Sequence, residues 1–496
     1  MAEQVDLVRP DGGTELRLAS RAARGIATTL VGQGGQLVLQ TTSVVILARL
    51  LDPRSFGLYA MVLVVVGVGE IFRDFGLSSA AVQAKHLSAA QRDQLFWINA
   101  AIGVALMIVL FTGAPVVAAL FGEPALTPIA RALAPTFLIN GLATQYRADL
   151  NRRMRFGRLA LTDLLAQAVA VGTGVTCAAL GAGYWSLVGA QLAQVSTVLA
   201  AVACFCAWLP GPPWRTADVR DLLIYGRSFI GAQLANYVGS NTDAVVAGLR
   251  FGGSPLGMYN RAFQLLMNPL NRFRVPATTV ALPVLARLQD EPQRSGRYLR
   301  RAQIALGYTI VAGLALVAGA SRPLVELLLG DQWAKVPPIL SLLALGAAFQ
   351  MVSYIGYWTF ISRGLTGSLF RFTLVSTTVR VACIVAGSSW GVVGVAAGYA
   401  VGQALSWPLS LMWLGRVTVL PIGELYRGAV RILAMAGAAC AAVYLTCNEL
   451  STRSSLVALG AACLVLVAVY IAGAVLTTAV RQDLRDTADV LRRVIR

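Results

Sequence analysis

The chain is poor in histidine and in acidic residues, and these shortages exclude several kinds of chemistry. It has one histidine, His86, and only 23 Asp and Glu against 41 Lys and Arg. Zinc sites and Ser/His/Asp hydrolysis depend on histidine, and His86 lies beside Lys85 in a segment that we expect to be a solvated loop. The seven cysteines lie within or at the ends of apolar segments, where cysteine acts as a small hydrophobe. We therefore expect no metal site, no disulfide framework and no cofactor.

Hydrophobic residues dominate what is present. They make up 57% of the 496 residues, charged residues make up 13%, and the mean hydropathy is +0.67. The stretches Gln94–Gly122, Leu164–Trp214 and Val381–Gly415 contain no charged residue. Because a transmembrane helix needs about 20 apolar residues, the last two stretches are each long enough for a helical hairpin. The sequence predicts an all-α, polytopic membrane protein.

At that length the apolar segments predict about fourteen transmembrane helices. They divide the chain into a cytoplasmic N-terminal tail (1–24), an N-lobe of six helices (25–215), a C-lobe of six (216–420), an extra helix pair (421–480) and a cytoplasmic C-terminal tail (481–496). The predicted helices begin near Gly25, Phe56, Gln94, Leu126, Leu159, Tyr184, Leu222, Pro255, Ala302, Val336, Phe372, Gly391, Ile432 and Ser455.

Long polar segments are missing. The chain has no Gly-x-x-x-x-Gly-Lys-Ser/Thr loop and no polar stretch that could form an ATPase domain, so by itself it cannot hydrolyse ATP. The longest predicted external loop covers only residues 322–335. A membrane-embedded glycosyltransferase or polymerase usually needs a large external loop or an acidic metal motif. These absences argue against an enzyme.

The formal net charge of +18 comes from arginines near the predicted helix ends. Most of them fall in loops on one side, as in residues 147–158 and 287–301, and such short loops face the cytoplasm. Both termini are therefore predicted to be cytoplasmic. This placement indicates orientation and attraction to anionic lipid headgroups, so we expect no nucleic-acid partner.

The two halves of the chain share a pattern. Gln33, Val38, Thr42, Val45, Gly57 and Tyr59 recur as Gln233, Val238, Thr242, Val245, Gly257 and Tyr259 at a constant offset of about 200 positions. In membrane transporters, substrate sites lie between such repeats. The repeat predicts two pseudo-symmetric bundles with polar residues of functional weight inside them.

Charged residues within the predicted helices are the strongest site candidates, because a charge in the membrane is costly without a partner or a polar cavity. Five arginines are predicted to form a cationic lumen that favours an anion, since a guanidinium can grip phosphate with two parallel hydrogen bonds. They are Arg73, Arg261, Arg272, Arg274 and Arg380. The other polar groups within these helices that are expected to face the lumen are Glu70, Asp74, Asn241 and Asp243.

Two plainer interpretations stay open for these charges. Glu70, Arg73 and Asp74 are spaced for pairing on one helical face and could merely tie helices together. Arg272 and Arg274 would lie at the cytoplasmic mouth if their helix were short.

Four motifs together resemble one family. They are Leu51-Asp-Pro-Arg-Ser-Phe-Gly-Leu-Tyr59, Arg153-Met-Arg-Phe-Gly-Arg158, Gly183-Tyr-Trp-Ser-Leu-Val-Gly189 and Leu329-Gly-Asp-Gln-Trp333. In order and spacing over roughly residues 20–420, they resemble the Wzx-type (WzxC-like) polysaccharide and O-antigen flippases of the MOP superfamily.

The resemblance implies a MOP/MATE-like fold and a flippase that carries a polyprenyl-diphosphate-linked oligosaccharide from the inner to the outer leaflet of a bacterial cytoplasmic membrane. The implied partners are membrane lipid, that glycan substrate, and polysaccharide polymerases or glycosyltransferases. On this resemblance Arg261, Arg272 and Arg274 would bind the diphosphate or acidic sugars. Gln33, Gln233 and Asp243 would contact hydroxyls or couple an ion. A MATE-type cation antiporter and a lipid II-type peptidoglycan precursor flippase are the alternatives, and the arginine excess disfavours the antiporter.

Overall fold

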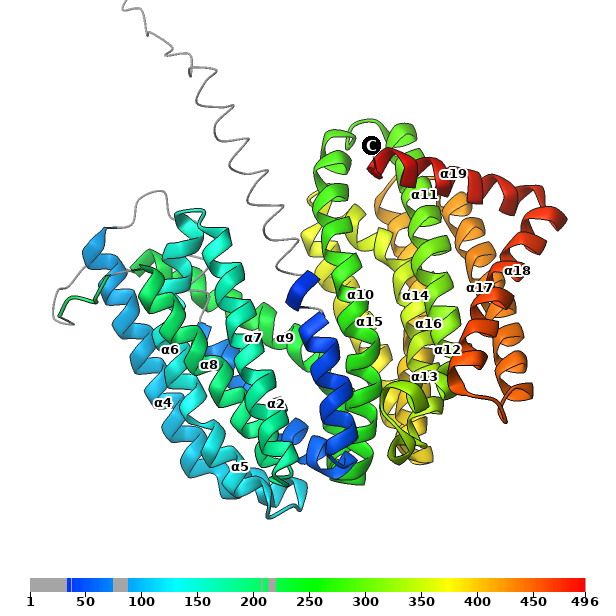
Figure 1. The fold of residues 1–496 in the computed structure, drawn as a ribbon. Coiled ribbons are helices and arrows are strands. Elements are labelled where there is room, and N and C mark those ends of the chain that lie inside the picture. The colour runs from blue at the N-terminus through cyan, green and yellow to red at the C-terminus, as the bar shows by residue number, and fades with distance from the viewer. Residues whose placement is uncertain (1–33, 37, 75–87, 207, 213–219, 496) are drawn as a thin grey trace, which may run out of the picture. The chain divides into compact units, whose positions relative to one another are not determined.

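The computed structural model describes residues 34–36, 38–74, 88–206, 208–212 and 220–495. Within these residues the chain forms helices and no strand, as the all-α prediction required (Figure 1). It divides into two compact units. Unit 1 comprises residues up to Leu50, Val65–Ala118 and Pro124–Ala235, and unit 2 comprises Leu51–Val64, Ala119–Glu123 and the chain from Asn236 onward.

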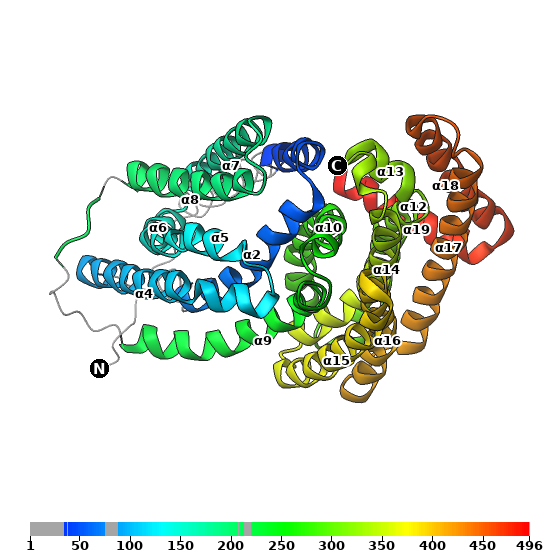
Figure 2. The same cartoon turned by 90° about the horizontal axis from the view of Figure 1, so that it is seen from below.

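Unit 1 is a bundle in which α7 packs along α8, and α6 packs against both (Figure 2). Gly103 and Gly141 allow α4 and α6 to cross closely, because a side chain at either would meet the other helix's backbone. The elements of this unit, three of them (α2, α4 and α9) shared with unit 2, are α2 (Pro53–Asp74), α4 (Ala89–Phe121), α5 (Leu126–Leu133), α6 (Pro135–Arg152), α7 (Phe156–Ala179), α8 (Trp185–Cys206) and α9 (Arg220–Phe251).

Unit 2 is built around α14, which packs against α10, α12 and α16, while α17 packs against α18 (Figure 2). Its elements, besides the parts of α2, α4 and α9 that belong to it, are α10 (Gly253–Arg287), α11 (Pro292–Leu306), η1 (Gly307–Val311), α12 (Ala312–Gly319), α13 (Ser321–Leu328), η2 (Asp331–Trp333), α14 (Val336–Ser362), α15 (Thr366–Gly387), η3 (Ser388–Trp390), α16 (Gly391–Val417), α17 (Ile422–Glu449), α18 (Ser455–Leu476) and α19 (Thr478–Ile495).

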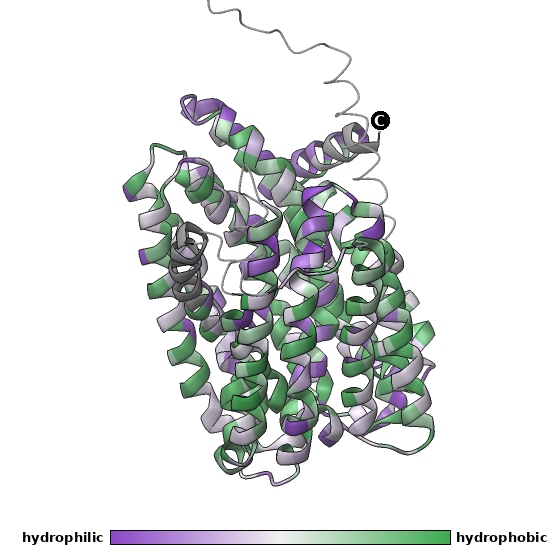
Figure 3. Cartoon of the chain, turned by 90° about the vertical axis from the view of Figure 1, so that its left-hand side faces the viewer, coloured by the Kyte–Doolittle hydropathy of each residue, from purple (hydrophilic) through white to green (hydrophobic). Residues whose placement is uncertain are grey.

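Nine segments of the described residues are long and apolar enough to cross a membrane, and one of them, Thr366–Val417, holds both α15 and α16. Figure 3 shows apolar residues along the helices, with hydrophilic residues gathered mostly toward their upper ends in that view. α9 and α10 are 32 and 35 residues long but carry arginine and amide side chains along their length. The count of fourteen stays a prediction.

Two glycines that the repeat pairs with each other lie at one helix contact. A side chain at Gly57 of α2 would collide with the carbonyl of Gly253, and one at Gly257 of α10 would collide with the carbonyl of Pro53. The repeat offset of 200 positions relates Gly57 to Gly257 and Pro53 to Gly253, so the two collisions are equivalent under the repeat. Reciprocal contacts of this kind are what a local two-fold axis produces, so the contact supports the internal repeat.

The segment predicted to be an external loop, residues 322–335, is largely helical, and its side of the membrane stays a prediction. The chain there forms α13 and the short 3-10 helix η2. Arg322 and Glu326 form an ion pair of 3.0 Å one turn apart, so the charges that indicated a loop cover the exposed face of a short amphipathic helix. Trp333 is fully buried and its ring lies 5.6 Å from that of Phe56.

Candidate functional site

A polar pocket of about 280 Å³ lies in unit 2 among the first part of α2, α9 and α10. Besides apolar side chains, five amides, two tyrosines, one serine and one aspartate line it. The lining residues are Ala60, Leu63, Val64, Tyr237, Ser240, Asn241, Asp243, Ala244, Tyr259, Asn260, Phe263, Gln264, Met267, Asn268 and Asn271. Such a concentration of amides between apolar helices is costly unless the groups face ligand or water.

Asp243 is the one acidic residue among the described residues that line this pocket. It is 5% exposed and accepts a hydrogen bond of 2.5 Å from the Tyr259 hydroxyl and one of 2.9 Å from the backbone N–H of Ala244. The Tyr259 ring stacks on Phe263, with centroids 6.2 Å apart. Asp243 is therefore held in one orientation by α10, which leaves its other lone pairs available.

Amide side chains form a stripe on α10. Asn260, Gln264 and Asn268 recur every four residues, so they lie on one helical face, and Asn271 continues this face. The Asn271 Oδ1 atom is buried and has no hydrogen-bond partner among the described residues. We call Asn260, Gln264, Asn268 and Asn271 the amide stripe. The search for charged residues in the sequence missed it, although its spacing of four residues is a readable signal.

The predicted arginines of α10 lie beside the pocket without lining it. Arg261 is buried, its guanidinium carbon lies 3.6 Å from the centroid of the Phe56 ring, and it donates a 3.2 Å hydrogen bond to Gln264 of the amide stripe. Arg274 lies 5.2 Å from the Tyr354 ring, and its Nε is buried with no partner among the described residues. Arg272 is half-buried on the same helix. α10 runs unbroken to Arg287, so these arginines lie within a long helix.

Arg380 and Asn241 have backbone partners. Arg380 of α15 donates from Nη2 to the carbonyl of Gly239 at 2.6 Å, and Asn241 donates to the carbonyl of Tyr237 at 2.9 Å. Arg380 thus contacts α9 one turn before Asp243. This contact ties α15 to the helix that carries the acid.

Arg73 and Glu70 form a separate cluster in unit 1. Glu70 and Arg73 form the expected ion pair, Arg73 also donates to Thr144 of α6, and Asn140 donates to Glu70 at 2.9 Å. The pair joins α2 to α6, which agrees with the interpretation that these charges hold helices together. Gln233 is exposed on α9. Gln33 and the side chain of Asp74 lie outside the described residues.

No three His, Cys, Asp or Glu side chains gather into a metal-ligating group in the part of the chain that the structure describes. What the pocket offers instead is a set of neutral donors and acceptors, one carboxylate and two tyrosines. Amides both donate and accept hydrogen bonds, as vicinal hydroxyls do, and aromatic rings offer an apolar face. The arrangement suits a polyhydroxylated ligand.

Comparison with known proteins agrees with this architecture. Over 410 residues, 81% of each chain, the sequence is 24% identical to the lipopolysaccharide biosynthesis protein WzxC of Escherichia coli. It is 25% identical to the succinoglycan biosynthesis transport protein ExoT of Rhizobium meliloti, over 75% of each chain.

Solved structures share the fold. The lipid II flippase MurJ superposes with a TM-score of 0.72 over 94% of this chain and 99% of that chain, at 14% identity. A multidrug resistance MATE family transporter of the MOP superfamily gives a TM-score of 0.60 over 79% and 96%, at 16% identity. The predicted MOP/MATE-like membrane fold is confirmed.

The family assignment follows from the sequence itself. The profile of the family described as "Polysaccharide biosynthesis protein" matches residues 46–338, more than half of the chain. This range contains the α2 motif, the Asp243 pocket and the buried Trp333. The chain therefore belongs to the polysaccharide biosynthesis protein family, as the resemblance to Wzx-type flippases predicted.

Proposed function

We propose that this chain is a flippase that moves a polyprenyl-diphosphate-linked oligosaccharide from the inner to the outer leaflet by alternating access, for the synthesis of cell-surface polysaccharide. The observation that carries the proposal is the polar pocket of unit 2, an amide-rich site between apolar helices in a member of a polysaccharide biosynthesis family. The relative ExoT is named a transport protein, which supports a transport function for this chain.

The pocket chemistry suits one part of such a substrate. A volume of about 280 Å³ is near the lower limit of small-molecule sites, about 300 Å³, so the pocket holds a sugar ring rather than a whole oligosaccharide. The amide stripe and Asp243 supply hydrogen bonds to hydroxyls. The Tyr259 and Phe263 rings, which stack on each other, supply an apolar face.

The charge of the substrate needs separate compensation. A diphosphate that crosses a membrane without partners would lose its hydration at a cost of many kcal/mol. Arg261, Arg272 and Arg274 repeat along α10, next to the amide stripe, and can receive the phosphates as the sugar enters the pocket. In this proposal the protein lies in the bacterial cytoplasmic membrane with both termini in the cytoplasm, and the chemistry of polymerisation belongs to partner enzymes.

The test is leaflet exchange of a fluorescent polyprenyl-diphosphate oligosaccharide in liposomes. We expect the native chain to exchange it, and Asn268→Leu and Arg274→Ala to slow exchange about tenfold or more, since each removes a substrate hydrogen bond worth about 1.4 kcal/mol or more. Arg453→Ala is the matched control, because Arg453 is exposed between α17 and α18. Absence of exchange by the native chain, with efflux of an organic cation driven by a proton or sodium gradient, would support the antiporter instead.

A further inference from the structure

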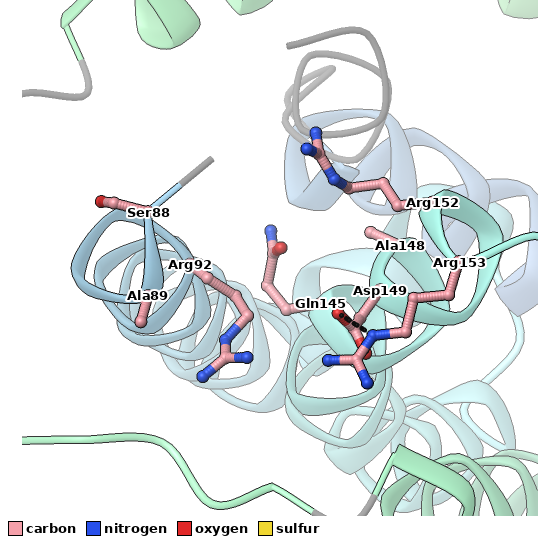
Figure 4. Close-up of a pocket in the computed structure, with 8 residues that line it drawn as sticks. All are labelled: Ser88, Ala89, Arg92, Gln145, Ala148, Asp149, Arg152 and Arg153. Atoms are coloured by element: carbon pink, nitrogen blue, oxygen red, sulfur yellow. Dashed lines mark hydrogen bonds and ion pairs between the residues drawn. The ribbon is translucent and has the colours of Figure 1, made fainter. Parts of the chain in front are cut away.

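A second pocket, of about 280 Å³, lies in unit 1, where the first turn of α4 faces the last turns of α6 (Figure 4). Three of its lining residues are arginines, Arg92 from α4 and Arg152 and Arg153 from the end of α6, and one is an acid, Asp149. The lining therefore has an excess of positive charge. None of these residues belongs to the Asp243 pocket or to the arginines of α10.

Arg92 is fixed on the α4 side of this pocket. Its guanidinium carbon lies 3.8 Å from the centroid of the Trp208 ring, and its Nη2 lies 3.2 Å from Asp93. The other carboxylate oxygen of Asp93 accepts a 3.1 Å hydrogen bond from the backbone N–H of Gly211. Because Arg92 is already held, a ligand that binds it loses little side-chain entropy.

The first turn of α4 adds to the positive side. Ser88 and Gln91 form a capping box, in which the Ser88 hydroxyl accepts from the Gln91 N–H at 3.1 Å and the Gln91 side chain accepts from the Ser88 N–H at 3.0 Å. Ser88 itself lines the pocket. The amino end of the 33-residue helix α4 therefore faces the cavity with its partial positive charge.

Gln145 of α6 lies between these two sides, as Figure 4 shows. It is 1% exposed, and its Nε2 has no hydrogen-bond partner among the described residues. Buried amide N–H groups in folded proteins are nearly always paired, and leaving one unpaired is unfavourable. An amide donor that borders a cationic pocket without a partner indicates an acceptor that occupies the pocket.

We propose that this pocket is a phosphate-binding site. Phosphate offers several oxygens to several donors at once, and guanidinium groups match its geometry. The volume accommodates a phosphate or diphosphate and excludes an oligosaccharide. Asp149 is paired with Arg153, whose Nε lies 2.9 Å from Oδ2 and donates a 3.1 Å hydrogen bond to Oδ1, and this pairing offsets its negative charge. That the phosphate belongs to the lipid-linked glycan is an assignment that rests on the proposed function, whereas phosphate binding does not.

Binding is tested with the full chain in nanodiscs of phosphatidylcholine, titrated with inorganic pyrophosphate in a calorimeter. We expect saturable binding that weakens about tenfold or more in Gln145→Leu and in Arg152→Gln, each of which removes a donor to the anion. Arg152→Lys should retain much of the affinity because it keeps the charge. Arg155→Gln is the matched control, since Arg155 is exposed in the same segment and does not line the pocket. Melting temperatures show that each variant is folded.

The proposal is overturned if the native chain shows no saturable binding, if neither pocket variant weakens it, or if Arg155→Gln weakens it equally. Two further titrations identify the source of the phosphate. Competition by farnesyl diphosphate points to the isoprenoid diphosphate, and weaker pyrophosphate binding in nanodiscs that contain phosphatidylglycerol points to a phospholipid headgroup. If the native chain binds pyrophosphate but fails the leaflet-exchange assay, the proposed flippase function is rejected and the phosphate-binding site is retained.

Discussion

At the scale of single residues, the Asp243–Tyr259 pair decides how the unit 2 pocket is held. Asp243 is buried, and its hydrogen bond from the Tyr259 hydroxyl joins α9 to α10. Removing the hydrogen-bond donor of a buried carboxylate costs more stability than removing the donor of a neutral acceptor. The reason is that the desolvation of the carboxylate is then uncompensated. The tyrosine hydroxyl is therefore the more sensitive partner of the pair.

This asymmetry predicts the order of stability in three variants. Tyr259→Phe should lower the free energy of unfolding by about 1–3 kcal/mol, because it leaves the Asp243 carboxylate without its side-chain donor. Asp243→Asn should cost less, since the amide oxygen still accepts from Tyr259. Tyr237→Phe is the control, because it removes a hydrogen bond to a neutral acceptor, the carbonyl of Val64. Thermal unfolding in detergent measures all three, and a greater loss in Asp243→Asn than in Tyr259→Phe would contradict the argument.

Sequence reasoning found the acid of this pocket and one of its amides, Asn241, but not the amide stripe. Asp243 and Asn241 stand out in an apolar segment, since ionisable residues within a membrane are few and costly. Asn260, Gln264 and Asn268 are neutral, so a search for ionisable residues passes over them, although their spacing of four residues places them on one face of a helix. Contacts such as that of Arg261 with Phe56 join residues far apart in the sequence, and no local pattern predicts them.

At the scale of elements, the contact of α2 with α10 is the point where the repeat has a structural consequence. Gly57 and Gly257 each lie against the backbone of the other helix. Asp52 and Pro53 fix the start of α2, since the Asp52 carboxylate accepts from the Ser55 N–H at 3.1 Å and proline suits the first helical position. Helices in membranes approach this closely only through small residues.

Adding one methyl group tests the contact from both sides. Gly57→Ala and Gly257→Ala should each destabilise the protein by about 1–3 kcal/mol, because the new Cβ would overlap a carbonyl of the facing helix and force the helices apart. Gly437→Ala on α17 is the control, since a Cβ there would have no neighbour within 4 Å. The midpoint of thermal unfolding gives the comparison. Equal behaviour of all three variants would show that the close approach is not required.

Several helices were predictable from the sequence, and those that were missed have a composition that resembles a loop or a tail. Uncharged stretches such as Leu164–Trp214 predicted a hairpin, and α7 and α8 form it around positive-φ glycines at Gly181 and Gly183. α13 was missed because a helix of 8 residues with charged groups has the composition of a loop. The segment predicted as a C-terminal tail, residues 481–496, lies mostly in helix α19. This helix contacts α17, because Asp483 is buried and pairs with Arg431 of α17 at 2.6 Å.

At the scale of the whole molecule, the sequence resemblance reflects structural contacts more than site chemistry. The motif around Phe56 and the motif that ends at Trp333 are about 280 residues apart in the sequence, yet their rings pack together, and Gln332 donates to the carbonyl of Leu51 at 3.2 Å. These residues hold unit 2 together. They identify the family and do not by themselves name the sugar, because in our proposal the sugar is bound by side chains outside these two motifs.

The proposed cargo makes the transport rate sensitive to membrane potential. An anion that moves outward across an inside-negative membrane gains about 2.3 kcal/mol per charge per 100 mV, so a diphosphate-linked glycan should leave the inner leaflet faster under an inside-negative potassium diffusion potential. The measurement is exchange of the fluorescent lipid in liposomes with and without valinomycin. The control is a lipid with the same glycan and no phosphate, whose exchange should not respond to potential. Equal rates for the diphosphate lipid at both potentials would mean that a counter-ion moves with it, so that the transported complex is neutral.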